Sequence, residues 1–280
     1  MKLTWLGCAS VRLDCGNKTL WVDPFMSING NADNPADEAT FADAHEILIT
    51  HGHFDHLMSI PEFNAEREIR VHCTDTPRET LLKCGIPEQR IRRFAVGEAF
   101  ELGDTKISVF QGQHNKIDMR IALQTALRVG TSIRRAVEFM RIVAVHKSFP
   151  EADETVLFEV QSGGERVQIM GSLGLRENVA RPELGADVLV LPFNGTSNPT
   201  PMAMRIVEAF RPKSVLLSHF DNAFPPMTSS VDLAPFISAM REKCPEIPVL
   251  LPKFGETVSV SAIKEIAAAP ATEIRNVYIA

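Results

Sequence analysis

A six-residue segment of this chain carries three histidines and an aspartate: His51, His53, Asp55 and His56. The run Glu46–Thr50 precedes it and predicts a buried strand that leads directly into the first histidine. Imidazole and carboxylate groups are good ligands for Zn²⁺ and similar ions. Packing gains nothing from placing so many costly polar groups together. The segment therefore predicts a metal site at the junction of a strand and a loop, and the fold has to keep that junction accessible.

The spacing within the segment indicates how the ligands are shared. His51 and His53 are separated by one residue, so both rings can converge on one ion as the strand ends. Asp55 and His56 lie past a turn and can face a second ion beside the first. Gly52 allows the backbone to turn tightly between them.

The rest of the chain mixes short strands with helices. Its first residues, up to Asp23-Pro24, form a meander of β-prone runs separated by glycine, and its last third alternates strands with helices. This mixture predicts an α/β fold in which helices cover the sheets. We find no repeat, low-complexity tract or linker, so one domain is expected over residues 1–280. The runs expected to be strands are Lys2–Leu6, Ser10–Cys15, Thr19–Val22, Ile69–Cys73, Arg92–Ala95, Lys106–Phe110, Thr155–Val160, Arg166–Met170, Val188–Leu191, Ser214–Leu217, Pro248–Leu251 and Thr257–Val260, and the expected helices include Pro77–Lys83, Met202–Phe210 and Val231–Glu242.

Residues 117–145 are expected to be a helical insertion, with an interruption at Gly130-Thr131-Ser132. One interpretation is a helical layer with solvated arginines. The other is a lid, or a wall of arginines for an anionic substrate. The apolar stretch Ile133–Val145 suits either a core or an interface, so the oligomeric state stays open. The arginines are Arg120, Arg128, Arg134, Arg135 and Arg141.

The charge and the cysteines indicate which classes of partner and which cellular compartment are expected. The formal net charge is −6 with both signs dispersed, which argues against a nucleic-acid partner. The five cysteines, Cys8 among them, are odd in number and lack CxxC spacing, which is typical of reduced thiols that pack as small hydrophobes. We see no secretion signal and no apolar run long enough to span a membrane, so a cytoplasmic location is expected.

The pattern His51-x-His53-x-Asp55-His56 matches the HxHxDH signature of the metallo-β-lactamase superfamily, and the chain resembles that family along its length. Asp23-Pro24 resembles the turn after the family's first strands. The nearest branch is the one that contains L-ascorbate-6-phosphate lactonase. The resemblance implies an α/β fold of the four-layer αββα sandwich type. It also matches His114 to the third histidine of a first metal site and His219 to the last histidine of a second site.

The implied ligand sets are His51, His53 and His114 for the first ion, and Asp55, His56 and His219 for the second. Ser172 stands where the family usually places an aspartate that bridges the two metals. Serine is neutral and a poor ligand, which leaves three alternatives: one metal, a weakly held second metal, or a different ion. Three carboxylates are candidates to replace the bridge, and Asp23 is expected to accept a hydrogen bond from a ligand histidine. These carboxylates belong to Asp118, Glu177 and Asp221.

The resemblance implies a metal-dependent hydrolase that uses one or two Zn²⁺ ions, with Mn²⁺ or Fe²⁺ as alternatives. Asp55 would orient the attacking water and pass on its proton, and His219 would hold the second ion or the transition-state oxyanion. The expected substrate is a small ester, lactone or phosphoester, with anionic molecules among the candidates.

Three alternatives to that function stay open. A phosphodiesterase or phospholipase would use the arginines of residues 117–145. A non-catalytic metal-containing binding protein would account for Ser172. Redox chemistry at two irons is a third alternative, although the di-iron members usually replace one histidine of the signature by an acidic residue.

The other polar residues have simpler explanations. His45, His72 and His146 lack neighbours in sequence that resemble ligands, and they are expected to be packing or surface residues. The segment Asn194–Asn198 suits either a polar wall of the pocket or an ordinary turn.

Overall fold

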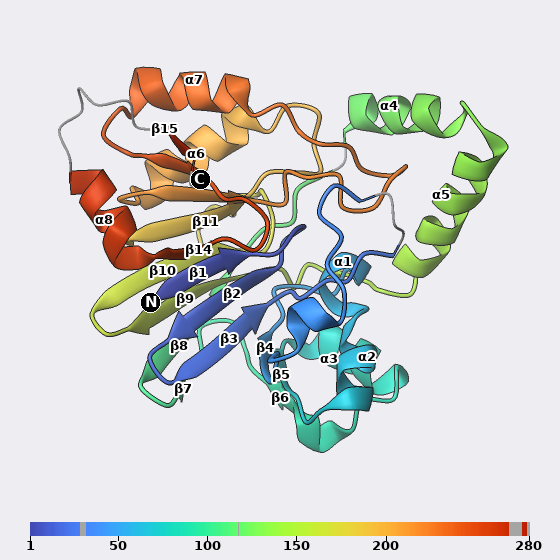
Figure 1. The fold of residues 1–280 in the computed structure, drawn as a ribbon, viewed down its shortest axis with the longest axis horizontal. Helices are drawn as coiled ribbons and strands as arrows, with labels where there is room; N and C mark the ends of the chain where they lie inside the picture. The colour runs from blue at the N-terminus through green and yellow to red at the C-terminus, as the bar shows by residue number, and fades with distance from the viewer. Residues whose placement is uncertain (29–31, 117, 269–275, 279–280) are drawn as a thin grey trace.

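Two β-sheets lie face to face at the centre of the computed structural model, which describes residues 1–28, 32–116, 118–268 and 276–278 (Figure 1). The first sheet has the strand order β14-β1-β2-β3-β4-β5-β6 and the second has the order β15-β13-β12-β11-β10-β9-β8-β7. The strands of the first sheet are β1 (Lys2–Trp5), β2 (Val11–Cys15), β3 (Lys18–Val22), β4 (Glu46–Leu48), β5 (Arg70–Cys73), β6 (Ile91–Arg93) and β14 (Thr257–Ser259). Those of the second are β7 (Ala99–Leu102), β8 (Thr105–Gln111), β9 (Val156–Ser162), β10 (Glu165–Met170), β11 (Val188–Pro192), β12 (Val215–Ser218), β13 (Val249–Leu251) and β15 (Asn276–Tyr278).

Each sheet begins antiparallel and continues parallel. Strands β1 to β3 and β7 to β10 pair antiparallel with their neighbours, and β3 to β6 and β10 to β13 pair parallel. Short turns suffice for antiparallel neighbours, whereas parallel neighbours need a longer crossover. Near the end of the chain β14 returns to the first sheet, where Val258 lies opposite Leu3 of β1.

Helices cover the outer faces of both sheets. Helices α1 (Phe54–Leu57), α2 (Ile60–Glu66) and α3 (Asp75–Lys83) contribute Leu57, Phe63 and Leu81 to a core against the first sheet. Helices α6 (Thr200–Phe210) and α7 (Ala234–Lys243) cover the second sheet through residues such as Ile206 and Phe236. The order helix, sheet, sheet, helix confirms the predicted α/β class and the four-layer αββα sandwich (Figure 1).

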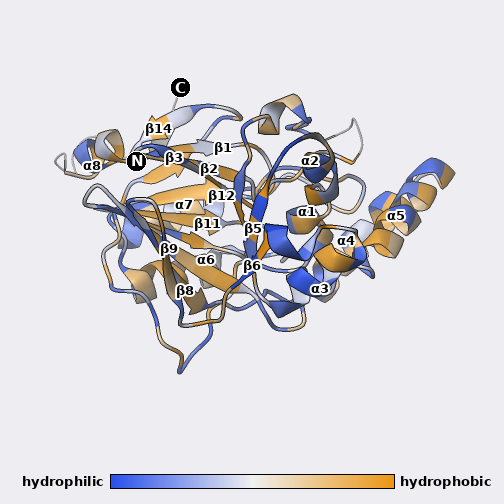
Figure 2. Ribbon diagram, turned by 90° about the horizontal axis from the view of Figure 1, so that it is seen from below, coloured by the Kyte–Doolittle hydropathy of each residue, from blue (hydrophilic) through white to orange (hydrophobic). Residues whose placement is uncertain are grey.

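Strand β11 shows how the sequence builds these layers. Val188 and Val190 face the core between the two sheets, and Leu189 and Leu191 face the core beneath α6 and α7. A strand that is buried on both faces reads as a continuous apolar run, because successive side chains point to opposite faces. The hydropathy colouring shows the apolar strands in the interior of the sandwich (Figure 2).

Most expected elements lie within two or three residues of their predicted bounds. Strands β7 and β15 and helix α8 (Val260–Ala268) were not predicted. The run Thr257–Val260 does form a strand, β14, but Val260 already begins α8.

The segment around residues 117–145 forms the helices α4 (Met119–Val129) and α5 (Ile133–His146), which meet at an angle and project beyond the sheets in both views (Figures 1 and 2). The two helices break where the sequence predicted an interruption. Near the end of α5, Ile142 is buried against Phe25 and Phe54. The outer stripe of the hairpin is exposed and apolar, and it consists of Met119, Leu123, Leu127, Ile133, Val137 and Met140.

Most arginines of this helical hairpin are exposed to solvent. Four of them, Arg120, Arg134, Arg135 and Arg141, are exposed. Arg128 is partly buried and donates a hydrogen bond to the carbonyl of Met227. This favours solvated arginines over a wall built around an anion. Among the described helices, none is both long enough and apolar enough to cross a membrane.

Candidate metal centre

The polar side chains predicted to bind metal converge from both sheets. The loop after β4 carries His51 and His53, and α1 follows at once with Asp55 and His56. His114 follows β8 of the second sheet, while His219 follows β12. The loop after β4 packs closely, because a Cβ atom on Gly52 would lie 2.1 Å from the carbonyl oxygen of Pro150. The glycine is therefore required for space, whereas its φ lies outside the left-handed region that favours glycine.

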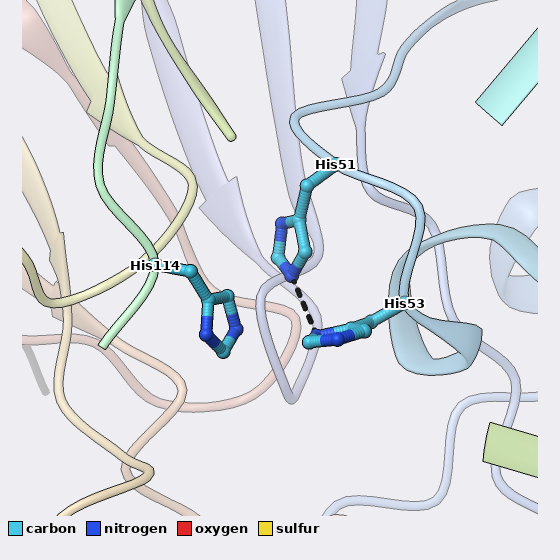
Figure 3. A group of neighbouring side chains, drawn as sticks. All are labelled: His51, His53 and His114. Atoms are coloured by element: carbon cyan, nitrogen blue, oxygen red, sulfur yellow. Dashed lines mark hydrogen bonds between the residues drawn. The ribbon is translucent and has the colours of Figure 1, made fainter. Parts of the chain in front are cut away.

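The first group of ligands, here called the histidine cluster, consists of His51, His53 and His114. Their ligand nitrogens all lie within 4.8 Å of one another. The Nε2 atom of His51 is 3.2 Å from Nδ1 of His53, and His114 faces both rings (Figure 3). Three imidazoles form the protein ligand set of one class of catalytic zinc site, with a fourth position left for water or substrate. The donor set therefore fits a divalent cation.

Burial keeps these three rings in the neutral form that binds metals. Burial, together with the charges of the neighbouring histidines, holds the pKa of His51 well below its ordinary value. Burial likewise lowers the pKa of His53 to about 3 and lowers the pKa of His114. A neutral imidazole offers a lone pair without first losing a proton, so the cluster is ready to bind a cation at neutral pH.

These pKa shifts predict how the metal-free protein responds to acid. In the unfolded chain His53 takes up a proton near its ordinary pKa of 6.5, whereas in the folded protein its pKa is about 3. The unfolded state binds more protons between these values, so the free energy of unfolding falls as the pH drops through this interval. Urea unfolding of metal-free protein at a series of pH values measures that slope. A His53→Gln variant should show a shallower decline, and equal slopes in both proteins would contradict the assignment.

A second group, here called the thiol cluster, consists of Cys8, Asp55 and His219. Their ligand atoms also lie within 4.8 Å of one another. The Nε2 atom of His219 is 3.2 Å from Oδ2 of Asp55. Cys8 was missed by the sequence analysis, which expected every cysteine to pack as a hydrophobe. No local sequence signal marks it, because its neighbours in the cluster lie far along the chain.

His56 lies between the two clusters and is oriented by Asp23. The Nδ1 atom of His56 donates to Oδ2 of Asp23 at 2.8 Å, and its Nε2 atom is 3.5 Å from Oδ2 of Asp55. Asp23 also accepts hydrogen bonds from the backbone N–H and the hydroxyl of Thr50, at 2.8 and 2.5 Å. A hydrogen bond on Nδ1 fixes the tautomer that leaves Nε2 free to act as a ligand.

The charges around His56 and Asp55 shift the pKa of each residue in the direction that favours its charged form. Burial alone would lower the pKa of His56, but the carboxylates of Asp23 and Asp55 raise it above its ordinary value. Burial opposes the ionisation of Asp55, yet His56 and His219 more than offset it and hold the pKa of Asp55 well below its usual range. Asp55 is therefore an ionised carboxylate in a buried site.

Ser172 sits at the edge of the site and is engaged with Asn115. Its hydroxyl donates to Oδ1 of Asn115 and accepts from the backbone N–H of the same residue, both at 3.2 Å. The preceding Gly171 packs against Thr50 just after β4, where a Cβ atom would lie 2.6 Å from the Cβ atom of Thr50. Ser172 is thus buried next to the residue that follows His114, with its hydrogen-bonding capacity in use.

Of the three carboxylates considered as replacements, Asp221 lies nearest to the clusters. It accepts a hydrogen bond from the backbone N–H of Cys8. Asp118 instead caps α4 and accepts hydrogen bonds from Thr196 and from the backbone of Ser197. Glu177 forms an exposed ion pair with Arg205. Asp118 and Glu177 therefore have structural partners of their own.

The segment 194–198 lies against the chain that follows His114. The carbonyl oxygen of Asn194 accepts a hydrogen bond from the side chain of Asn115 at 2.6 Å. Gly195 has a φ of 86°, and a Cβ atom there would lie 2.2 Å from Nδ2 of Asn115. The segment is therefore a turn that also adjoins the site.

His146 has a neighbour that the sequence did not suggest. Its ring centroid lies 4.7 Å from that of His53, because α5 ends beside the histidine cluster. The other two histidines have packing partners: His45 is exposed and bonds to the carbonyl of Glu68, and His72 is buried and pairs with Glu46 at 2.8 Å. His146 was missed because only the path of the helical hairpin brings it close.

Comparison with known proteins identifies relatives of this architecture. The model of the beta-lactamase superfamily domain matches residues 18–220. A UPF0173 metal-dependent hydrolase of Ruegeria sp. is 30% identical over 138 residues, which cover 48% of this chain and 58% of that protein. The chain thus matches somewhat more than half of this relative's length.

One further relative and one solved structure are matched over nearly their whole length. A UPF0173 metal-dependent hydrolase of Methylobacterium nodulans is 25% identical over 268 residues, covering 93% of this chain and 100% of that protein. Among solved structures, the metallo hydrolase Igni18 from Ignicoccus hospitalis superposes with a TM-score of 0.59 at 16% identity, covering 92% of this chain and 97% of that one. This last likeness is one of fold.

Proposed function

The chain belongs to the beta-lactamase superfamily, and from this membership we propose that it is a metal-dependent hydrolase acting on a small ester, lactone or phosphoester. The observation that carries the proposal is the convergence of His51, His53 and His114 within 4.8 Å of one another. The names of the UPF0173 relatives as metal-dependent hydrolases support the same class of reaction.

The histidine cluster would hold the cation, with Zn²⁺ as the first candidate and Mn²⁺ or Fe²⁺ as alternatives. A divalent cation supplies Lewis acidity and makes water nucleophilic near neutral pH. The neutral state of all three rings, which burial favours, suits them to this role. The donor set does not distinguish Zn²⁺ from its competitors, because imidazole binds several transition metals.

The remaining residues of the site would handle water and protons. Asp55 is buried, ionised and within 3.2 Å of His219, so its carboxylate can accept a proton from an attacking water and return it to a leaving group. His219 would hold a second ion or donate a hydrogen bond to an oxygen that gains charge in the transition state. Asp23 acts through His56, which it holds in one orientation.

The surroundings favour a neutral or weakly charged substrate over a phosphodiester or phospholipid. Ser172, Asn115 and the turn at Asn194 supply uncharged polar groups beside the histidine cluster. The arginines that a phosphodiesterase would use are mostly exposed on the helical hairpin. An ester or a lactone, including the lactone class suggested by the sequence resemblance, is therefore the first substrate to test. All five cysteines are free, which supports the expectation of a reducing, cytoplasmic compartment.

Removal and replacement of the metal test the proposal. Purified protein is stripped with a chelator, reconstituted separately with Zn²⁺, Mn²⁺ and Fe²⁺, and assayed against p-nitrophenyl acetate, a simple lactone, p-nitrophenyl phosphate and bis-p-nitrophenyl phosphate. We expect turnover of the ester or the lactone that chelation abolishes and one of the metals restores. Bound metal without turnover of any of the four would overturn the hydrolase assignment in favour of a binding protein.

A further inference from the structure

Three segments far apart in the sequence place the thiol of Cys8 between a carboxylate and an imidazole. The Sγ atom of Cys8 is 3.8 Å from Oδ2 of Asp55 and 3.7 Å from Nε2 of His219. Cys8 follows β1, Asp55 lies in α1 and His219 follows β12. Only the folded chain brings these three donors together.

The separations between these atoms match those of ligands around one tetrahedral ion. With metal–sulfur distances of about 2.3 Å and metal–nitrogen or metal–oxygen distances of about 2.1 Å, sulfur lies about 3.6 Å from each other ligand atom, and nitrogen about 3.4 Å from oxygen. With Nε2 of His219 as the ligand nitrogen, the observed separations are 3.8 Å from Sγ to Oδ2, 3.7 Å from Sγ to Nε2 and 3.2 Å from Nε2 to Oδ2. The donors therefore have the spacing that a cation requires without any rearrangement of the chain.

The backbone of Cys8 is held in this position against its own preference. Its φ is 46°, in the left-handed region that residues with a side chain rarely adopt, and His219 is also left-handed, with a φ of 54°. The carbonyl of Cys8 accepts hydrogen bonds from the backbone N–H of His219 at 2.7 Å and from Nε1 of Trp5 at 2.9 Å. The N–H of Cys8 donates to Asp221 at 3.1 Å. Strain that the surroundings enforce is concentrated at functional sites.

Packing alone gives a weaker account of Cys8. Its side chain does touch an apolar group that includes Phe25, Phe54 and Phe224, as a buried thiol commonly does. A small hydrophobe, however, gains nothing from facing an ionised carboxylate and an imidazole, or from a strained φ. Ser172 leaves the site without the negative charge of a bridging carboxylate, because it is neutral and its hydroxyl is engaged with Asn115.

We propose that Cys8, Asp55 and His219 bind a second divalent cation, with the thiolate of Cys8 supplying the negative charge that Ser172 does not provide. Cation binding displaces the thiol proton, so the metal would meet one thiolate, one carboxylate and one imidazole. A thiolate ligand favours Zn²⁺, Co²⁺ and Cd²⁺ over Mn²⁺ and Mg²⁺, whose preferred ligands are oxygens. The proposal rests on the metal-dependent function proposed above, and it adds Cys8 as a ligand, with a metal preference, to the second position for which the resemblance implied Asp55, His56 and His219.

Cobalt titration of the metal-free protein tests this assignment, because thiolate-to-cobalt charge transfer gives a near-ultraviolet band that histidine and carboxylate ligands do not produce. We expect wild-type protein to bind about two equivalents of Co²⁺ and to show the thiolate band. Cys8→Ser should bind about one equivalent and lack the band. Cys15→Ser is the matched control and should behave as wild type, since Cys15 is an equally buried thiol in β2 that joins no group of metal ligands among the described residues.

The possible outcomes separate this inference from the proposed function. A thiolate band that persists in Cys8→Ser, or two bound equivalents without any such band in wild type, would overturn the role of Cys8. One equivalent without the band in wild type would also overturn it, while leaving the histidine cluster and the hydrolase proposal intact. Binding of no cobalt at all would refute both. Circular dichroism of each variant shows whether Cys8→Ser is folded, and Cys8→Ala provides a second variant with a smaller change in polarity.

Discussion

Replacing His53 by alanine is expected to reduce hydrolysis at least a hundredfold and to release the cation from the histidine cluster. The variant would leave His51 and His114 as two imidazoles, one ligand short of the set that the structure brings within 4.8 Å. Loss of even an outer partner of a metal ligand commonly costs about 10–100-fold in metal affinity or activity, so loss of a direct ligand should cost more. Metal content by inductively coupled plasma mass spectrometry and turnover of the best substrate measure the two effects.

His45→Ala is the matched control for that experiment. His45 is exposed and lies outside both clusters, and its ring bonds to the carbonyl of Glu68. It should keep full metal content and activity. If His53→Ala retained both as well, the cation would have to be held elsewhere and the histidine cluster would lose its assignment.

The second large effect is expected from Asp23→Asn, which should lower the free energy of unfolding by about 3 kcal/mol and weaken metal binding. The change preserves shape, but the new amide places an N–H group against two donors, Nδ1 of His56 and the hydroxyl of Thr50. Asp23 is only 1% exposed, so water cannot relieve the mismatch. His56 would also lose the hydrogen bond that fixes its tautomer.

Chemical denaturation of the metal-free proteins isolates the structural part of this effect. Asp14→Asn serves as the control, because Asp14 is partly exposed and pairs with Arg12 at the surface of β2. Exposed pairs of this kind contribute at most about 1 kcal/mol. Equal unfolding midpoints for Asp23→Asn and Asp14→Asn would mean that the buried hydrogen bonds of Asp23 contribute little to folding.

The fold was predictable because its signals are local. Most strands carry their own apolar pattern, as the run from Val188 to Leu191 illustrates, and the junction of β4 with His51 is visible in six consecutive residues. Strand β7 was missed since its pattern is short and half exposed, with Ala99 and Glu101 facing outward. The bounds of α4 and α5 followed from the interruption at Gly130, but their projection away from the sheets did not.

The parts of the site that escaped prediction depend on contacts between distant segments. A buried cysteine is an ordinary core residue, and only the placement of His219, 211 residues away in sequence, distinguishes Cys8 from Cys15. His146 approaches His53 because α5 returns toward the sheets, which no local pattern encodes. The HxHxDH segment could be identified without such information, because all of its ligands lie on one short stretch of chain.

The histidine cluster takes two ligands from the end of the first sheet and one from the second. A cation bound there joins the two halves of the sandwich. The free energy of unfolding therefore depends on the concentration of available metal. A ligand present at a hundred times its dissociation constant stabilises the folded state by about 2.7 kcal/mol, and each further tenfold adds about 1.4 kcal/mol. Chains that open when metal is scarce are exposed to proteolysis, and stability changes of this size alter protein abundance several-fold. The amount of this protein in a cell should therefore track metal supply even when its synthesis does not change.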